Sequence, residues 1–275
     1  MNDVHAKITE DIISAMESCE GKGRSLWDRQ CDLPMNLFSR KPYTGINTVH
    51  LWSSALHHEY ASPFWLTYKQ AQELGGQVRA GEHGTSAVFY KQIPGKDPED
   101  DAMHMILRSF TVFNLAQIDG IENPEERERP LFEILADGER LLEKSPVTIT
   151  EGGNRAYYRP STDEICLPPR AEFVDRESFY STAAHEMIHS TGHQSRLDRD
   201  LKGRFGESAY AMEELVAELG SAFLCAGIGI HAQTRQDHAH YLKSWIRVLK
   251  EDKKAIFTAS SAASKAASFI TAKAA

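Results

Sequence analysis

The chain has 275 residues, of which 41% are hydrophobic and 25% are charged, and its formal net charge at pH 7 is −8. Such a composition is typical of a globular protein with one or two domains. No apolar stretch approaches the ~20 residues that a membrane helix needs, and the N-terminal segment lacks the apolar core of a signal peptide. The four cysteines form no Cys-x-x-Cys pair, which argues against a cysteine zinc site and a disulfide scaffold. We therefore expect a cytoplasmic protein without a membrane partner.

The first half of the chain combines helical patterning with one pair of strands. Apolar residues at helical spacing, together with glycine stop signals, predict helices over residues 4–19, 45–60 and 67–75. Two β-rich runs, over residues 86–93 and 106–113, predict strands that are joined by a polar, acidic loop.

An acidic segment with two prolines, residues 119–130, cannot bury much surface. We interpret it as the boundary between two domains, residues 1–125 and 126–275, while a simple surface loop remains the alternative. Beyond it, the patterning predicts a helix, a strand, a hairpin and then four helices. In chain order these elements span residues 131–143, 147–150, 156–167, 175–191, 207–226, 235–250 and 252–270. The fold class expected from this order is α+β.

The most informative motif is His185-Glu-Met-Ile-His189, in a segment that Asp175 can cap and Gly192 can end as a helix. A spacing of four residues puts both imidazoles on one helix face, where they can bind one Zn²⁺ at about 2.0–2.1 Å each. Glu186 follows the first histidine and can take a proton from a water molecule that attacks a carbonyl. The motif thus predicts a metal-dependent hydrolase site with Glu186 as catalytic base. The competing interpretation is a helix with two surface histidines.

A tetrahedral catalytic zinc needs a third protein ligand, and the next helix offers three acids in an apolar stretch: Glu213, Glu214 and Glu218. Glu214 and Glu218 share a helix face, so Glu214 can bind the metal while Glu218 accepts a hydrogen bond from the outer nitrogen of a ligand histidine. Glu213 is offset by about 100° from Glu214 and is expected to face elsewhere. Glu218 and His193 remain alternatives for the third ligand. His193 continues the series 185, 189, 193, but three ligands along one straight helix face cannot surround a metal tetrahedrally. The order of the acids resembles the gluzincin pattern. We expect Zn²⁺, with Mn²⁺ as the alternative.

The segment from Gly21 to Lys91 holds eight basic residues, five acids and ten of the 25 aromatic residues of the chain. Aromatic rings interleaved with lysine and arginine can stack unpaired bases while the cations contact phosphates, which suits single-stranded nucleic acid. Candidate contacts in polar, loop-like segments are Arg40, Lys41, Tyr43, Arg79 and His83. The competing interpretation is that the aromatic residues form the core of a small domain, in particular Trp52, Phe64, Trp65 and Phe89.

Several ordered motifs together resemble ArdC-type antirestriction proteins of plasmids and phages, over nearly the whole chain. In the first half these are Leu33-Pro-Met-Asn36, Pro42-Tyr-Thr-Gly-Ile-Asn47, Gly81-Glu-His-Gly84 and Phe110-Thr-Val-Phe-Asn114. In the second half they are the histidine motif, Thr191-Gly-His-Gln-Ser-Arg-Leu197, Gly203-Arg-Phe-Gly206 and Glu213-Glu-Leu-Val-Ala-Glu218.

The resemblance implies an N-terminal single-stranded-DNA-binding domain of mixed α/β structure and a C-terminal zincin-like metallopeptidase domain. It implies a protein that shields incoming DNA from host restriction, with His185, His189 and a glutamate of the next helix as metal ligands. A protein substrate would belong to the host restriction or DNA-processing machinery. The alternative is a DNA-binding protection protein whose metallopeptidase domain is structural and catalytically silent. A secreted or housekeeping peptidase fits less well, because the chain shows no signal peptide and carries the aromatic, basic segment.

Overall fold

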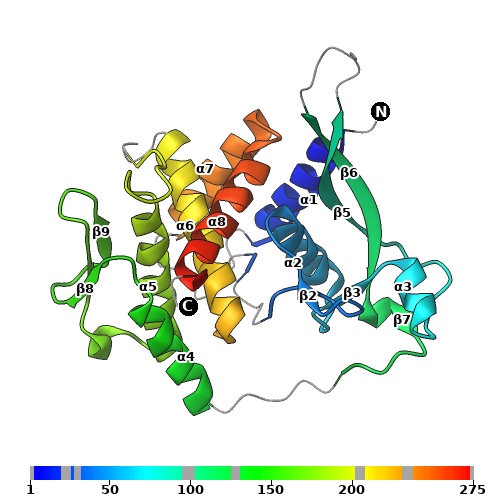
Figure 1. Cartoon of the computed structure of the whole chain (residues 1–275), viewed down its shortest axis with the longest axis horizontal. Coiled ribbons are helices and arrows are strands. Elements are labelled where there is room, and N and C mark those ends of the chain that lie inside the picture. The colour runs from blue at the N-terminus through cyan, green and yellow to red at the C-terminus, as the bar shows by residue number, and fades with distance from the viewer. Residues whose placement is uncertain are drawn as a thin grey trace.

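The structure is a computed structural model. It describes residues 3–19, 26–27, 32–94, 103–124, 131–201, 208–230 and 238–272. Figure 1 shows the helices α5 to α8 at the centre, with strands β5 and β6 on one side and the small sheet that contains β8 and β9 on the other.

The N-terminal half contains short strands and three helices around one longer strand pair. In chain order its elements are α1 (Val4–Cys19), β1 (Met35–Asn36), β2 (Lys41–Pro42), α2 (Ile46–His58), β3 (Phe64–Leu66), α3 (Tyr68–Glu73), β4 (Gln77–Val78), β5 (Thr85–Pro94), β6 (Met103–Asn114), the 3₁₀ turn η1 (Leu115–Gln117) and β7 (Ile118–Asp119).

Five of these strands form one sheet in the order β2-β1-β3-β6-β5, so β5 is an edge strand. Its antiparallel ladder with β6 runs from the Thr85–Val112 pair to the Pro94–Met103 pair. Helix α2 covers part of the free edge, because the Asn47 side chain donates to the Val88 carbonyl and accepts from the Val88 N–H, both at 2.8 Å. The edge is therefore closed at this point by a side chain instead of another strand.

The C-terminal half places a small sheet beside a bundle of helices. Its elements are α4 (Leu131–Glu143), β8 (Thr148–Glu151), β9 (Tyr157–Arg159), β10 (Glu164–Leu167), the 3₁₀ turn η2 (Arg170–Glu172), α5 (Arg176–Thr191), α6 (Ser208–Ile228), α7 (His238–Glu251) and α8 (Ala255–Ala272). The sheet order is β8-β10-β9, with β10 parallel to β8 and antiparallel to β9. Strand β9 is thus an outer strand, and it lies against α5.

One continuous hydrophobic core includes residues of both halves. It contains the apolar faces of α1 and α2 together with residues of α5 to α8. Two aromatic pairs cross between the halves: the rings of Trp52 and Phe223 are 5.7 Å apart, and those of Trp27 and Trp245 are 6.2 Å apart. Trp27 and Trp52 are therefore core residues and are not available for stacking.

The close packing of α5 on α6 brings the histidine motif next to the acids of α6. Gly220 of α6 faces Ile188 of α5, where an added Cβ would lie 2.7 Å from the Ile188 Cδ1 atom. Glycine at this position therefore lets the two helix backbones approach each other directly beside His189.

The described elements confirm the expected α+β fold, including the long strand pair, the hairpin and the four final helices. The short strands β1 to β4 and β7 were not predicted, because two or three residues carry no readable periodicity. The predicted boundary at residue 125 falls on residues 125–130, which lie outside the described residues. None of the described helices is both long enough and apolar enough to cross a membrane.

Candidate metal centre

Helix α5 begins as the sequence predicts, with Asp175 as its N-cap: the carboxylate accepts the Ser178 N–H at 2.7 Å. The helix ends at Gly192. Its central segment is packed inside the protein, and His185 and Glu186 are only 2% and 3% exposed. Two polar side chains held this deep need partners or a ligand.

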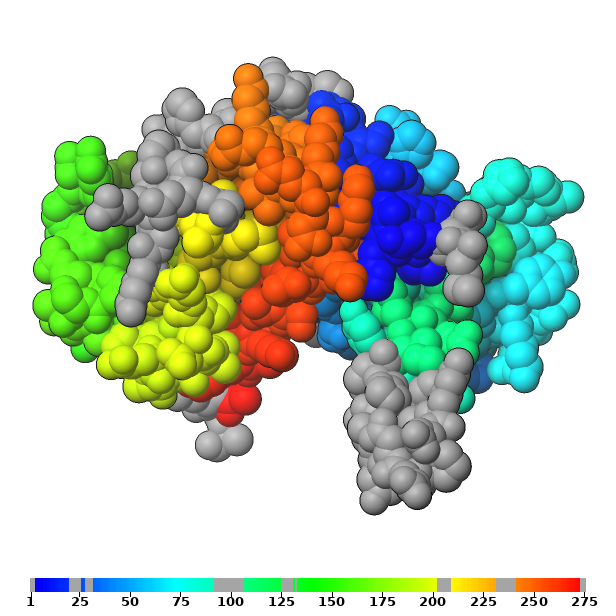
Figure 2. Space-filling view, turned by 90° about the horizontal axis from the view of Figure 1, so that it is seen from above, coloured from blue at the N-terminus to red at the C-terminus, as the bar shows by residue number. Residues whose placement is uncertain are grey.

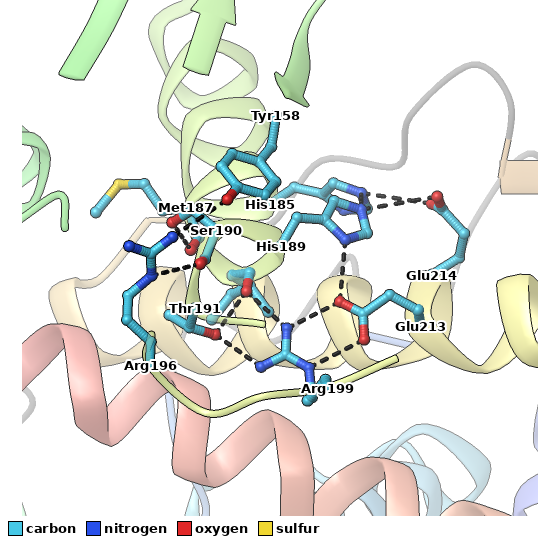
Figure 3. Close-up of polar contacts among 11 residues, drawn as sticks. Tyr158, His185, Met187, His189, Ser190, Thr191, Arg196, Arg199, Glu213 and Glu214 are labelled. Carbon is cyan, nitrogen blue, oxygen red and sulfur yellow. Dashed lines mark hydrogen bonds and ion pairs between the residues drawn. The ribbon is translucent and has the colours of Figure 1, made fainter. Parts of the chain in front are cut away.

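His185, His189 and Glu214 bring their ligand atoms together within 4.8 Å of one another. The two Nε2 atoms are 3.1 Å apart, and the Glu214 oxygens lie 3.5 Å from Nε2 of His185 and 3.7 Å from Nε2 of His189. Figure 3 shows both imidazoles pointing toward the Glu214 carboxylate. Among the described residues, this is the one group of histidine, cysteine or acidic side chains close enough to hold a metal ion.

The spacing of these donors fits a tetrahedral site. Ligands at about 2.05 Å from one ion are separated by about 3.3 Å, the edge length of a tetrahedron. The three observed separations lie on either side of that value. Two imidazole nitrogens and one carboxylate oxygen are also a donor set that zinc accepts, with a fourth position left for water or substrate.

The outer nitrogen of His189 is held by Glu213, which corrects two expectations. Nδ1 of His189 lies 3.1 Å from the Glu213 carboxylate, which accepts a hydrogen bond from it, so Nε2 is the nitrogen that can bind a metal. Glu213 was expected to face elsewhere, and Glu218 was expected in this position. The outer nitrogen of the other histidine, Nδ1 of His185, is buried and has no hydrogen-bond partner among the described residues, so Glu218 does not hold that ring either.

The physical reason lies in the imidazole ring. Its two nitrogens point in different directions, so a ring that sits over α6 meets two neighbouring carboxylates whose side chains diverge by about 100° around that helix. Glu214 faces one edge of His189 and Glu213 faces the other. The position of the His189 ring between these two acids was not predicted.

Arg199 completes this arrangement and was not predicted. Its guanidinium donates to both oxygens of Glu213, at 3.0 and 2.8 Å, and to the Ile188 carbonyl at 2.8 Å. A further bond reaches the Thr191 hydroxyl at 2.8 Å. Arg199 therefore ties the loop after α5 to the carboxylate that orients His189 (Figure 3).

The ionisation of these groups follows from the same contacts. Burial alone would lower the pKa of His189, but the hydrogen bond to Glu213 and the charge of Glu214 raise it to about 9. Burial alone would raise the pKa of Glu214, but the hydrogen bond from His185 and the charge of His189 lower it to about 2. The carboxylate is thus ionised at neutral pH, whereas a metal ion must displace a proton to bind His189.

Glu186 faces the same cleft and is positioned by strand β9. Its Oε2 atom accepts the backbone N–H of Tyr158 at 2.9 Å. The cleft has a volume of about 260 Å³ and is bordered by β9, by both histidines, by Glu214 and by Tyr210. The predicted base and the three predicted ligands therefore share one cavity.

Neither His193, the histidine alternative for the third ligand, nor Tyr210, which borders the cleft, belongs to the cluster of ligand residues. His193 is not among the clustered ligand residues, and its Nδ1 atom is 2.8 Å from the hydroxyl of Ser195. The Tyr210 hydroxyl is 3.1 Å from that of Tyr241, and burial raises its pKa.

The five predicted nucleic-acid contacts lie in the N-terminal half and do not border the metal cleft. Arg40, Lys41, Arg79 and His83 are exposed, whereas Tyr43 is half-buried. Arg79 is held by Glu82 at 2.8 Å and by Asp119 at 3.3 Å, so its charge is already paired. Of the aromatic residues in this half, Trp52, Phe64 and Trp65 are buried, while Phe89 is 47% exposed.

Two family models match successive parts of the chain. Residues 2–131 match the N-terminal domain of anti-restriction factor ArdC, and residues 136–262 match a zincin-like metallopeptidase domain, which implies a divalent metal. A relative from Sinorhizobium fredii, the uncharacterized protein y4eC, is 40% identical over 98% of this chain and 92% of its own length. Two proteins named DNA primase TraC from Escherichia coli are 36% and 38% identical over 98% of this chain, but the chain spans only 20% and 27% of their lengths.

Solved structures agree with these relationships. The metal-free crystal structure of the antirestriction protein ArdC from the R388 plasmid is 37% identical, with a TM-score of 0.82, over 98% of this chain and 97% of its own. Its Mn(II)-bound structure is also 37% identical, with a TM-score of 0.83, over 99% of this chain and 98% of its own. This chain therefore belongs to the ArdC family of antirestriction proteins and combines an ArdC N-terminal domain with a zincin-like metallopeptidase domain.

Proposed function

We propose that this protein binds single-stranded DNA through its N-terminal domain and hydrolyses peptide bonds at a metal site formed by His185, His189 and Glu214. The observation that carries the peptidase part is the convergence of three ligand side chains beside Glu186 in one cleft. Zn²⁺ is the metal that this donor set suits best, and Mn²⁺ is the alternative that the Mn(II)-bound relative suggests.

A divalent ion in this site would polarise the scissile carbonyl and make a water molecule more acidic. The chain itself supplies the proton transfers. Glu186, fixed by the Tyr158 N–H, takes the proton of the attacking water and then delivers it to the leaving amine. Strand β9 is an outer strand that borders this cleft, so an extended peptide can lie along it on either side of the Tyr158 N–H that Glu186 occupies, with its scissile bond next to Glu186.

In the cell, we propose that the protein protects incoming plasmid or phage DNA from host restriction in the cytoplasm. Membership in the ArdC family and the antirestriction relative support this role. Single-strand binding by the N-terminal domain would bring the peptidase site to the entering DNA. Its protein substrate would then be a component of the host restriction or DNA-processing machinery.

The decisive experiment is Glu186→Gln, tested for protection and for single-strand affinity in parallel. Glutamine keeps the shape and the acceptor for the Tyr158 N–H but cannot take a proton. We expect protection to be lost while metal content and affinity for a fluorescent oligonucleotide stay at the wild-type level. Unchanged protection would instead show that the metallopeptidase domain is a structural part of a DNA-binding protection protein.

A further inference from the structure

A long groove separates the edge of the N-terminal sheet from the last helix of the chain. It has a volume of about 1510 Å³ and runs between β5 and the start of α2 on one side and α8 and the loop after α5 on the other. Figure 2 shows the hollow between α8, coloured orange to red, and the green strands β5 and β6. Small-molecule sites measure about 300–1,000 Å³. A groove of this size is therefore suited to a polymer.

Among the described residues, the fixed charges that line the groove are all of one sign, positive. The chain holds 39 acidic and 31 basic residues, yet the groove is lined by two lysines and two arginines and by no acidic side chain among the described residues. An acidic protein that concentrates cations along one groove attracts an anionic ligand there.

The two lysines supply the charge that is available to a ligand. Arg196 and Arg199 already pair with Asp163 and Glu213. Lys254 and Lys265, in contrast, are exposed and form no ion pair with any residue that the structure describes. Lys254 directly precedes α8 and Lys265 lies in the middle of that helix. Their positive charges are therefore spread along the groove and not gathered at one point.

The opposite wall offers aromatic surface. Phe89 and Tyr90 of β5 are 47% and 52% exposed and both line the groove. Because they are consecutive in a strand, their rings lie on opposite faces of the sheet, on either side of the edge that borders the groove. Large aromatic side chains facing water beside cations are the combination that binds unpaired bases.

An acidic peptide is a less suitable occupant. A peptide would gain most by pairing with the free edge of β5. At Val88, however, both the N–H and the carbonyl that face away from β6 are already bonded to Asn47. Bases that stack on side chains do not need those backbone groups.

We propose that this groove between the two domains is the path of a single-stranded nucleic acid, with bases against Phe89 and Tyr90 and phosphates at Lys254 and Lys265. The proposal rests on the single-strand binding proposed above and places it differently from Arg40, Lys41, Tyr43, Arg79 and His83, none of which lines the groove. It also makes α8 of the metallopeptidase domain part of the nucleic-acid site.

The test compares Lys254→Gln/Lys265→Gln with the charge-matched Lys69→Gln/Lys250→Gln, whose lysines are exposed outside the groove. Binding of the full chain to a fluorescent oligothymidine is titrated at several salt concentrations. Each phosphate contact on a single strand contributes about −0.7 to the slope of log affinity against log salt. The groove variant should lose about 1.4 from that slope, and the control should keep it.

A second variant tests the proposed stacking of bases on Phe89 without changing the charge of the groove. Phe89→Ala should bind oligothymidine about tenfold more weakly with an unchanged salt slope, and Phe89→Trp should restore binding. On an abasic oligonucleotide the alanine variant should equal the wild type. The circular dichroism melting curve of each variant confirms that it is folded.

Two results would contradict the proposal that this groove binds single-stranded nucleic acid. One is that wild type binds oligothymidine while the groove variant and its control have the same affinity and salt slope; single-strand binding then stands, but at another site. The other is that poly-glutamate binds the wild type more tightly than oligothymidine does at the same salt concentration and loses that affinity in the groove variant, which would identify an acidic polypeptide as the occupant. A wild type without single-strand affinity would instead refute the proposed DNA-binding function itself.

Discussion

Nδ1 of His189 lies 3.1 Å from the carboxylate of Glu213, and both oxygens of this carboxylate also accept hydrogen bonds from the guanidinium of Arg199. The contact fixes which nitrogen of His189 carries the proton and turns Nε2 toward His185 and Glu214. His185 has no such partner for its outer nitrogen among the described residues. Among the described residues, a side-chain partner at the outer nitrogen therefore orients the ring of His189 but not that of His185.

Glu213→Gln should therefore weaken metal binding. Loss of an outer hydrogen-bond partner of a metal ligand typically lowers affinity by about 10- to 100-fold. The measurement is a competition titration of the folded protein against a chelator with a zinc-sensitive absorbance. Glu218→Gln is the matched control on the same helix, and we expect it to stay within about threefold of wild type, since neither outer nitrogen contacts Glu218. Equal losses in both variants would contradict the role of Glu213.

The comparison of sequence and structure shows where local patterns stop being informative. The pair His185 and His189, with Glu186 between them, was predictable because the geometry of one helix turn determines their relationship. Glu214 was predictable as a candidate ligand once the next helix was recognised. Arg199 was not, because the loop after α5 has no regular period that would show where its side chain points.

The fold shows the same limit. Long, periodic elements such as α1 were predicted to within a residue or two, because burial of one face determines their spacing. The partner of that face could not be predicted. The acidic segment before residue 131 indicated a boundary between two domains, whereas the buried face of α1 belongs to the same core as α6 to α8. The local spacing of apolar residues does not show which distant segments will contact each other.

His185→Ala should remove the metal, whereas His193→Ala should retain it. Wild type is expected to bind about one ion per chain, and two remaining ligands cannot hold it tightly. His193 continues the same spacing along the sequence but contacts Ser195 and lies outside the ligand cluster. Metal content of the purified proteins, measured by plasma mass spectrometry, decides between the two. If the purified His193→Ala variant contained no metal, His193 would have to be counted among the metal ligands.

Acid should weaken the connection between the hairpin and the loop after α5. The guanidinium of Arg196 lowers the pKa of Asp163 from 3.8 to about 2, with further help from the Tyr158 hydroxyl. Because the folded-state pKa lies below the unfolded value, the stabilisation is fully present above pH 3.8 and is lost as the pH falls toward about 2. Since the carboxylate is partly exposed, the effect is about 1 kcal/mol.

Asp163→Asn tests this by urea unfolding across the pH range. Asparagine tolerates the positive φ of 54° at this turn, so the variant changes mainly the charge. The free energy of unfolding of the variant should be lower than that of wild type at pH 7, and the two should converge near pH 2. A difference that does not change with pH would show that the ion pair is not its cause.

Trp52→Ala should destabilise both domains together. Trp52 of α2 is 1% exposed and its ring lies 5.7 Å from that of Phe223 in α6, within the core that the two halves share. Truncation of a buried tryptophan lowers the free energy of unfolding by about 3–5 kcal/mol. Because the core is shared, this loss should lower the stability of every element that packs on it. In hydrogen exchange at increasing urea, peptides from α1 and from α6 should therefore lose protection at the same, lower midpoint. Phe38→Ala, at a side chain that is 48% exposed, should change that midpoint little. If α1 opened while α6 kept its wild-type midpoint, the two halves would have independent stabilities and the shared core would not couple them.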